Sequence, residues 1–389
     1  MVVSKAILNI NLIRKILHRL HIGLPLINVL DTDNAKNCLM VYVQEPFLQT
    51  NVNSIHQLFL QCIEIAKIMN NLGYNVDVIN YYSKYVHFNK KYDAVFDICP
   101  GKKLVYRKNL KPDAKKVVYF TGSEPGFANR AELERIRNLE KRRGSKIKPR
   151  RQSELNFKEV EKFDVAILIG DEYNFSTYGG FNLPKTYLVP NTGYDFGNRF
   201  DLSKRKSTSF LYFGSYGCVH KGLDLLLEVF AEKNFPCTLY VCGNFKDEKD
   251  FMNEYKRELF YTDNIKAVGF IDIWSEEFIR ICSECCYTIL PSCSEARAGA
   301  IATCMSAQLI PICSKMCGYS EDVETVTLND CSKECIRDTI LNYAKRDMDW
   351  IVKRSGKVLE LVEKKYSMKE FIKAMDTALS YVLADKSGG

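Results

Sequence analysis

The sequence predicts an α/β protein of two domains in tandem, each built around a mostly parallel sheet, which face each other across a cleft. Three observations support this fold class. The chain has 389 residues, which is too long for one ordinary hydrophobic core. Short apolar runs alternate with amphipathic helical patterns, and this alternation is typical of parallel, doubly wound sheets. The alternation stops at a polar stretch, 201–209, and then starts again.

The composition is that of a soluble globular protein, with 46% hydrophobic and 26% charged residues. No apolar run is long enough to span a bilayer, and the run at 22–30 lacks the small-residue cleavage site of a signal peptide. The 15 cysteines lie mostly inside apolar segments, which indicates reduced, packed thiols. We therefore expect a chain that is not exported and stays in the cytoplasm.

One cysteine cluster could either bind zinc or pack in the core. It contains Cys282, Cys285 and Cys286. The cluster has C-x-x-C spacing, but no matching pair of cysteines or histidines follows elsewhere. The pattern favours core packing, and we expect no metal site.

The net charge of +8 is concentrated in two basic clusters. One cluster is 141–151. The other lies in the N-terminal segment, 1–36, where apolar residues at 10, 13, 17 and 20 have the spacing of an amphipathic helix. Either cluster is a solvated charge run, or it attracts an anionic membrane surface or a polyanionic acceptor. We expect no nucleic acid as partner, because neither cluster is interleaved with aromatic residues.

The first domain is expected over 37–200. An amphipathic helix is predicted to begin at Ser54 and to end before Gly73. Strands are predicted at 38–43, 75–79, 92–97, 116–120, 163–169 and 185–189.

The second domain is expected over 201–365, followed by a C-terminal helix and tail over 366–389. One helix is predicted at 223–230 and another from near Ala298. Strands are predicted at 209–213, 237–241, 265–269, 287–290 and 309–313. In such a fold the ligand lies between the domains, at the carboxyl ends of the strands.

Two strand-to-helix loops of the second domain carry residues suited to binding a ligand. In the loop over 213–222, glycines and Lys221 precede a helix, an arrangement that favours a phosphate, although an ordinary turn has the same pattern. In the loop after Leu290, Ser294 and Glu295 precede a helix rich in small residues. Glu295 could bind sugar hydroxyls or merely cap that helix.

Together these segments resemble the GT-B glycosyltransferases, specifically the retaining group called family four (glycosyl transferases group 1). The resemblance covers almost the whole chain. It rests on Lys221-Gly222-Leu-Asp-Leu-Leu226, Leu239-Tyr-Val-Cys-Gly243, Val268-Gly269-Phe270-Ile271, Pro291-Ser292-Cys-Ser294-Glu295, Gly318 and, in the first half, Val189-Pro190-Asn191-Thr-Gly193-Tyr-Asp195. It implies two Rossmann-like domains facing across a cleft, with the C-terminal helix packing back on the first domain.

The resemblance also implies roles for individual residues. Lys221 and Glu295 would be catalytic: Lys221 would stabilise the charge on the leaving diphosphate, and Glu295 would orient the transferred sugar. The donor-binding residues would be Gly214, Ser215, Tyr216, Gly217, Gly243, Phe270, Ile271, Ser294, Arg297, Ala298, Gly299 and Thr303. The acceptor would lie near Phe47, Ser123, Glu124 and Phe127.

The chain departs from the family pattern at three places. Thr303 stands where the family has a second glutamate, which would make the grip on the ribose weaker. The loop over 214–220 lacks an arginine that the family often carries there. The loop over 121–125 offers Glu124 where the family often has a histidine.

The resemblance implies transfer of a hexosyl unit, with retention, from a UDP-sugar such as UDP-glucose to a glycan or lipid-linked glycan in cell-surface polysaccharide synthesis. No cofactor is expected, and the enzyme is expected to need no metal. The site of action would be the cytoplasm or the inner face of the membrane. Two alternatives stay open: a sugar-nucleotide epimerase of the same fold, and a non-catalytic UDP-sugar-binding subunit, which Thr303 suggests.

Overall fold

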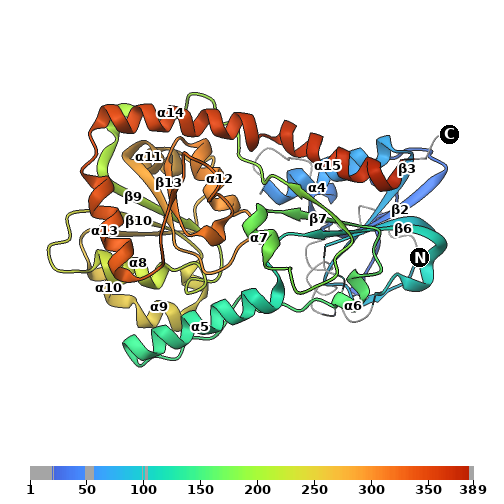
Figure 1. Ribbon diagram of the computed structural model, residues 1–389, viewed down its shortest axis with the longest axis horizontal. Coiled ribbons are helices and arrows are strands. Elements are labelled where there is room, and N and C mark those ends of the chain that lie inside the picture. The colour runs from blue at the N-terminus through green and yellow to red at the C-terminus, as the bar shows by residue number, and fades with distance from the viewer. Residues whose placement is uncertain (1–19, 21, 49–56, 99, 101–103, 385–389) are drawn as a thin grey trace.

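The computed structural model describes residues 20, 22–48, 57–98, 100 and 104–384. The predicted N-terminal basic helix and the predicted helix start at Ser54 lie outside the described residues. Within them the chain forms two α/β lobes side by side (Figure 1). The predicted fold class is confirmed, because each lobe contains a six-stranded parallel sheet flanked by helices.

The N-terminal sheet has the strand order β3-β2-β5-β6-β7-β8, and every neighbouring pair is parallel. Its strands are β2 (Lys36–Tyr42), β3 (Tyr74–Asn80), β5 (Tyr92–Asp97), β6 (Leu110–Phe120), β7 (Val165–Ile169) and β8 (Lys185–Val189). The helices of this half are α3 (Glu45–Leu48), α4 (Gln57–Asn71), α5 (Pro125–Arg143), α6 (Phe157–Val160) and α7 (Glu172–Ser176). A small parallel pair, β1 (Ile22–Gly23) and β4 (Tyr85–Val86), lies beside them.

Both faces of this sheet are buried, as expected for a parallel sheet covered by helices. In β2, Cys38 and Met40 pack into one apolar cluster, whereas Leu39 and Val41 pack into another. Since side chains alternate along a strand, these two clusters lie on opposite faces of the sheet. β6 begins at Leu110, earlier than the predicted start at Lys116. Its first half pairs with β5 through an irregular register and is polar, which hid it from a search for apolar runs.

The C-terminal sheet has the order β11-β10-β9-β12-β13-β14 and is again parallel throughout. Its strands are β9 (Lys206–Gly214), β10 (Thr238–Gly243), β11 (Ile265–Gly269), β12 (Cys285–Leu290), β13 (Ile310–Cys313) and β14 (Val326–Thr327). Its helices are α8 (Leu223–Phe230), α9 (Lys249–Glu254), α10 (Lys256–Tyr261), α11 (Glu276–Glu284), α12 (Gly299–Ser306), α13 (Lys333–Ala344) and α14 (Met348–Lys365). Four 3₁₀ turns complete the described chain: η1 (Arg107–Asn109), η2 (Leu202–Lys204), η3 (Phe245–Asp247) and η4 (Lys315–Cys317).

The chain crosses between the lobes more than once. The last helix, α15 (Met368–Leu383), continues from the line of α14 and lies on the N-terminal lobe beside α4, as predicted (Figure 1). Conversely α5, which follows β6 of the N-terminal sheet, extends along the C-terminal lobe near α8 and α9 (Figure 1).

The cysteines of the C-x-x-C cluster are packed in the interior. Cys282, Cys285 and Cys286 are each fully buried, and the described cysteines are free thiols. Burial raises the pKa of the Cys286 thiol to about 11 and keeps it protonated at neutral pH. These side chains therefore behave as small apolar residues of the core, in line with the packing interpretation.

Candidate donor site in the cleft between the domains

A cavity of about 510 Å³ lies between the two domains. In the N-terminal half, its wall includes Tyr42, Thr121, Ile169 and Asn191, which end or follow β2, β6, β7 and β8 at their carboxyl ends. In the C-terminal half, Gly214, Gly243, Phe270 and Glu295 follow β9, β10, β11 and β12 or end them. The carboxyl edges of both sheets thus face one another, which is where α/β folds place their ligands.

An ion pair between Lys221 and Glu295 forms part of the cavity wall. Lys221 Nζ lies 2.5 Å from Glu295 Oε1, and the two side chains are only 5% and 10% exposed. The hydroxyl of Ser292 donates to the same oxygen at 3.0 Å. No contact of the described residues holds the second oxygen, Oε2, so it is left to face a ligand.

The charge on Glu295 is held by its surroundings. Burial by itself would raise the pKa of this carboxyl, but the positive charges of Lys221 and Arg151 outweigh burial and lower the pKa to about 2. Glu295 is therefore ionised at neutral pH. It is available to accept hydrogen bonds from hydroxyl groups.

Gly222 lets the loop that carries Lys221 approach the loop that carries Glu295. Gly222 has a φ of +74°, and a Cβ atom there would lie 2.5 Å from the Pro291 carbonyl oxygen. A side chain at this position would therefore be strained and would push the two loops apart. The pair Lys221-Gly222 thus places the ammonium group of Lys221 next to Glu295, just before the first turn of α8.

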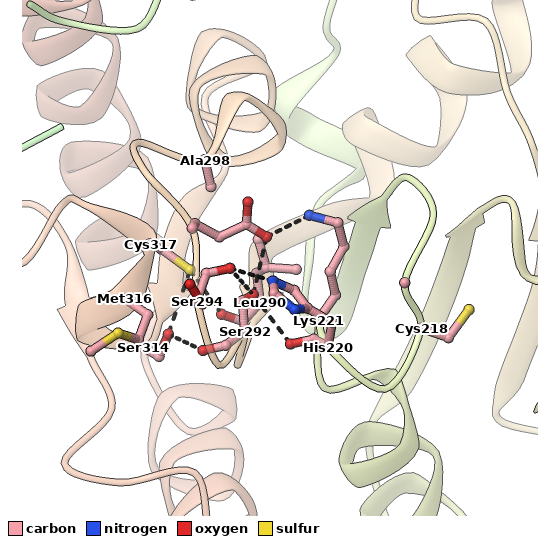
Figure 2. A network of polar contacts seen from close by, with 12 residues as sticks. Cys218, His220, Lys221, Leu290, Ser292, Ser294, Ala298, Ser314, Met316 and Cys317 are labelled. Atoms are coloured by element: carbon pink, nitrogen blue, oxygen red, sulfur yellow. Dashed lines mark hydrogen bonds and ion pairs between the residues drawn. The ribbon is translucent and has the colours of Figure 1, made fainter. Parts of the chain in front are cut away.

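His220 links the same two loops through hydrogen bonds (Figure 2). Its Nε2–H donates to the Ser294 carbonyl oxygen, and its own carbonyl accepts the N–H of Cys293 at 2.9 Å. Burial, together with the nearby charge of Lys221, lowers the pKa of His220 to about 4 despite the influence of Glu295. The ring is therefore neutral at pH 7 and keeps the proton that this hydrogen bond needs.

The N-terminus of α12 opens on the cavity. Ala298, Gly299 and Ala300 line the cavity, and among the described residues no hydrogen bond engages the N–H groups of Gly299 and Ala300. Free N–H groups and the positive end of the helix dipole make such a position favourable for anions. With Lys221, the cavity therefore has two positive elements suited to a diphosphate.

Most of the predicted donor residues lie in the cavity wall, together with both predicted catalytic residues. The donor residues in the wall are Gly214, Ser215, Gly243, Phe270, Ile271, Arg297, Ala298, Gly299 and Thr303. Phe270 is 78% exposed there, which leaves its ring available to an aromatic base.

Tyr216, Gly217 and Ser294 are outside this wall. The N–H groups of Gly217 and Cys218, which could have faced a phosphate, instead donate to the buried carboxylate of Glu248 at 2.5 and 3.1 Å. An internal anion thus occupies this part of the glycine loop. Ser294 is buried, and its carbonyl is taken by His220.

The four residues predicted to lie near the acceptor are not part of the cavity wall either. Phe47 packs on the core of the N-terminal domain, and Phe127 lies in the first turn of α5. Ser123 donates to the backbone carbonyl of Glu295. Glu124 is the N-cap of α5 and accepts the N–H groups of Gly126 and Phe127, which explains a carboxylate in this loop without a ligand.

Thr303 lines the cavity, but a residue that the sequence did not single out holds its hydroxyl. Gln57 of α4 donates to Thr303 Oγ1 at 3.0 Å and to the Gly299 carbonyl at 3.2 Å. The Thr303 hydroxyl in turn donates to the Gly299 carbonyl at 2.9 Å. A hydrogen bond from the N-terminal domain thus reaches the place where the resembled family has its second glutamate.

The basic cluster at 141–151 is solvated only in part, because its lysines are exposed while three of its arginines are in ion pairs. Arg142 contacts Asp224 at 2.7 Å, and Arg143 contacts Glu254 and Glu258 at 2.7 Å each. These contacts use charge that would otherwise be available to a membrane or a polyanion. They place the cluster on the C-terminal domain rather than on the acceptor side of the cleft.

Comparison with known proteins agrees with this geometry. Residues 198–326 match the family model described as glycosyl transferases group 1. No curated protein sequence matches the chain significantly. No helix among the described residues is long and apolar enough to cross a membrane.

Solved structures share the fold at low sequence identity. HepE of Anabaena, in complex with UDP and glucose, has a TM-score of 0.58 and 11% identity over 89% of this chain and 100% of its own. Sucrose-phosphate synthase of Thermosynechococcus elongatus has a TM-score of 0.60 and 12% identity over 87% and 97%. TarM of S. aureus has a TM-score of 0.52 and 13% identity over 72% of this chain, which spans 55% of the length of TarM. The family match thus covers a part of the chain that lies mostly in the second domain, and the solved structures share the two-domain GT-B fold of the whole chain.

Proposed function

We propose that the chain transfers a hexosyl unit from a nucleoside diphosphate sugar to a hydroxyl group of a glycan or lipid-linked glycan. The observation that carries the proposal is the cavity between the domains, where an ionised glutamate, a lysine and a helix N-terminus converge. These groups match the sugar hydroxyls and the diphosphate of such a donor.

The nucleotide is proposed to lie along the ends of β10 and β11. Gly243 and Ile271 line the cavity there, and the exposed ring of Phe270 can stack on a base. A uracil base is the natural first candidate, because HepE and TarM were solved with UDP. UDP-glucose is accordingly the first donor to test.

The diphosphate is proposed to bind between Lys221 and the first N–H groups of α12. When the bond from the sugar to the diphosphate breaks, negative charge grows on the leaving phosphate oxygen. Positive groups already fixed in a buried site stabilise this charge without having to reorganise. Lys221 needs only one of its three N–H donors for Glu295, so the others can reach the phosphate.

Glu295 is proposed to hold the hydroxyls of the transferred sugar through Oε2, while Lys221 and Ser292 hold Oε1. Fixing the sugar in this way sets which face of the anomeric carbon is open to the acceptor. We propose that the new bond forms with retention. Proton NMR of the first product formed, read at its anomeric signal, tests this.

We propose that turnover needs no metal, because Lys221 and α12 stand where the charge of the leaving group develops. Activity should then be unchanged by EDTA. Loss of activity on chelation, with recovery on adding Mg²⁺ or Mn²⁺, would contradict this part of the proposal.

The acceptor is proposed to approach over the N-terminal wall of the cavity, past Tyr42, Thr121 and Asn191. Work at the cytoplasmic face of a membrane, in polysaccharide synthesis, would suit a lipid-linked acceptor. Lys141, Lys146 and Lys148 are exposed and could still meet anionic lipids. Flotation with anionic liposomes at low salt tests the membrane part, and absence of binding would dispose of it.

A two-step experiment tests the function itself. First, UDP-, GDP- and ADP-sugars are compared by thermal shift, because a ligand that binds the folded state raises the melting temperature. The stabilising donor is then incubated alone and with glycan acceptors, and the products are identified by mass spectrometry and NMR. Glycosylated acceptor supports the proposal, an epimerised donor in the absence of acceptor indicates an epimerase, and binding without turnover indicates a non-catalytic subunit.

A further inference from the structure

Helix α5 and the segment after it, residues 144–155 (the strap), belong to the N-terminal half in sequence but are fixed to the C-terminal domain. Leu139 and Ile147 lie in the apolar core of that domain. Arg150 pairs with Asp250, and the N–H of Lys148 donates to the same carboxylate at 3.0 Å. The strap is therefore expected to stay with the donor-binding domain if the cleft opens or closes.

Arg151 of the strap lies at the donor cavity. It is one of the residues that line the cavity. Its Cγ and Cδ atoms lie against Gly217, so closely that a Cβ atom on Gly217 would be 2.8 Å from Cγ. Its positive charge also contributes to lowering the pKa of Glu295, which lies on the same cavity. The guanidinium is thus close enough to Glu295 to affect the charges that face a ligand.

The backbone of Arg151 is clamped, whereas its charge is unused. Its N–H donates to both carboxylate oxygens of Glu132, at 3.0 Å each, and Glu132 is 1% exposed. The neighbouring guanidiniums of Arg142, Arg143 and Arg150 are all in ion pairs. In the described part of the chain, no hydrogen bond or ion pair engages the guanidinium of Arg151.

The glycine loop next to Arg151 has few groups of its own to offer an anion. The loop contains no arginine. The N–H groups of Gly217 and Cys218 are occupied by Glu248. A diphosphate carries more charge than Lys221 can balance alone, and a guanidinium can bind phosphate oxygens in a bidentate manner.

We propose that Arg151 is a donor-binding residue that reaches the diphosphate from the strap and supplies a second positive charge opposite Lys221. This inference rests on the proposed function, since it takes a nucleoside diphosphate sugar as the ligand. In this proposal a residue of the N-terminal half binds the phosphate in place of an arginine, which the glycine loop lacks. Gly217 is then required partly because a side chain there would displace Arg151.

Calorimetric titration of the full chain tests the inference. UDP, GDP and ADP are each titrated into the wild type, together with the matching nucleosides, which lack phosphate. Arg151→Ala should weaken the nucleoside diphosphate that binds the wild type by about tenfold or more, as expected for a lost charged hydrogen bond. Binding of the nucleoside should change less than twofold, and Arg151→Lys should recover part of the affinity.

Lys148→Ala is the matched control, because it removes an exposed positive charge from the same strap outside the cavity. It should bind the nucleoside diphosphate like the wild type. Equal diphosphate affinity in Arg151→Ala and the wild type would overturn the inference and leave the proposed function standing, as would an equal loss for the nucleoside. If the wild type binds none of the nucleotides, the proposed function fails and this inference fails with it.

Discussion

Lys221 and Glu295 lie 74 positions apart in the sequence and form one buried ion pair. Each was predictable from its own strand-to-helix loop, because that local pattern places polar residues at the carboxyl edge of a sheet. Their direct contact was not, since it depends on how closely Gly222 lets the two loops approach. A buried pair is costly to break by removing one partner, because the other charge is then left without compensation.

Lys221→Ala should lower kcat/KM for the sugar donor. The decrease should correspond to a loss of about 2–4 kcal/mol in transition-state stabilisation, the magnitude found for a lost group that stabilises a developing anion. The reason is that, in the proposed mechanism, Lys221 faces the phosphate oxygen on which charge grows. Steady-state kinetics with the identified donor measure the effect, with Lys148→Ala as control. Near-normal turnover in Lys221→Ala would remove Lys221 from the mechanism.

The ionisation of Glu295 should make the fold acid-sensitive in a defined range. Its pKa is about 2 in the folded chain, below the value of about 4.3 expected for an unfolded one. The contribution of the ionised Glu295 to the free energy of unfolding is therefore fully present above about pH 4.3 and is lost as the pH falls toward 2. Urea unfolding across this range should show a smaller loss of stability for Glu295→Gln than for the wild type. Equal losses in the two proteins would contradict this.

Gln57 and Arg151 mark the limit of what the sequence could say about the site. Both line the cavity, yet each comes from a segment far from the motifs and acts on the other domain. A pattern within one segment cannot reveal a partner that only the folded chain brings near. For the same reason Glu124, a plausible ligand by its position in a loop, turned out to cap α5.

At the scale of elements, the sequence predicted most strands but missed several helices, of which α5 is the longest. β5, β8, β11 and α8 have the predicted bounds, because apolar runs and amphipathic periods are local signals. α5 has no apolar stripe, and only Glu132 and Leu139 of its residues are buried. Ion pairs to residues about a hundred positions later hold its C-terminal turn. Composition alone could not show these partners, and it left a solvated charge run and a surface for a membrane or polyanion open there.

Arg143→Ala should therefore destabilise the C-terminal domain although Arg143 comes from the N-terminal half. Its guanidinium pairs with Glu254 and Glu258 and lies 4.5 Å from the centre of the Tyr255 ring. Because the pairs are partly exposed, we expect a loss of about 1–3 kcal/mol in the free energy of unfolding. Urea denaturation measures it.

Arg137→Ala, at an exposed position on the same helix, is the control and should change stability by no more than about 0.5 kcal/mol. Both variants remove one arginine from α5, so helix propensity and net charge change alike. If they are equally stable, the ion pairs do not hold α5 on the C-terminal domain.

At the scale of the whole molecule, each domain depends on a segment from the other half of the chain. α5 and the strap are fixed to the C-terminal domain, and α15 returns to complete the N-terminal one. Phe371, Met375 and Leu379 of α15 are fully buried in the apolar core that also contains the inner face of α4. The sequence predicted the return of α15 through the family resemblance, whereas the crossing of α5 had no such signal.

Phe371→Ala should destabilise the N-terminal domain by about 3–5 kcal/mol, the usual cost of a cavity left by a buried phenylalanine. Two probes can separate the domains, because both tryptophans of the chain, Trp274 and Trp350, lie in the C-terminal domain. Far-UV circular dichroism, which reports on both domains, should show loss of structure beginning at a lower urea concentration than the unfolding reported by tryptophan fluorescence. Lys373→Ala, an exposed position on the same helix, should leave both midpoints at their wild-type values. If Phe371→Ala also leaves both midpoints unchanged, α15 is not part of the N-terminal core.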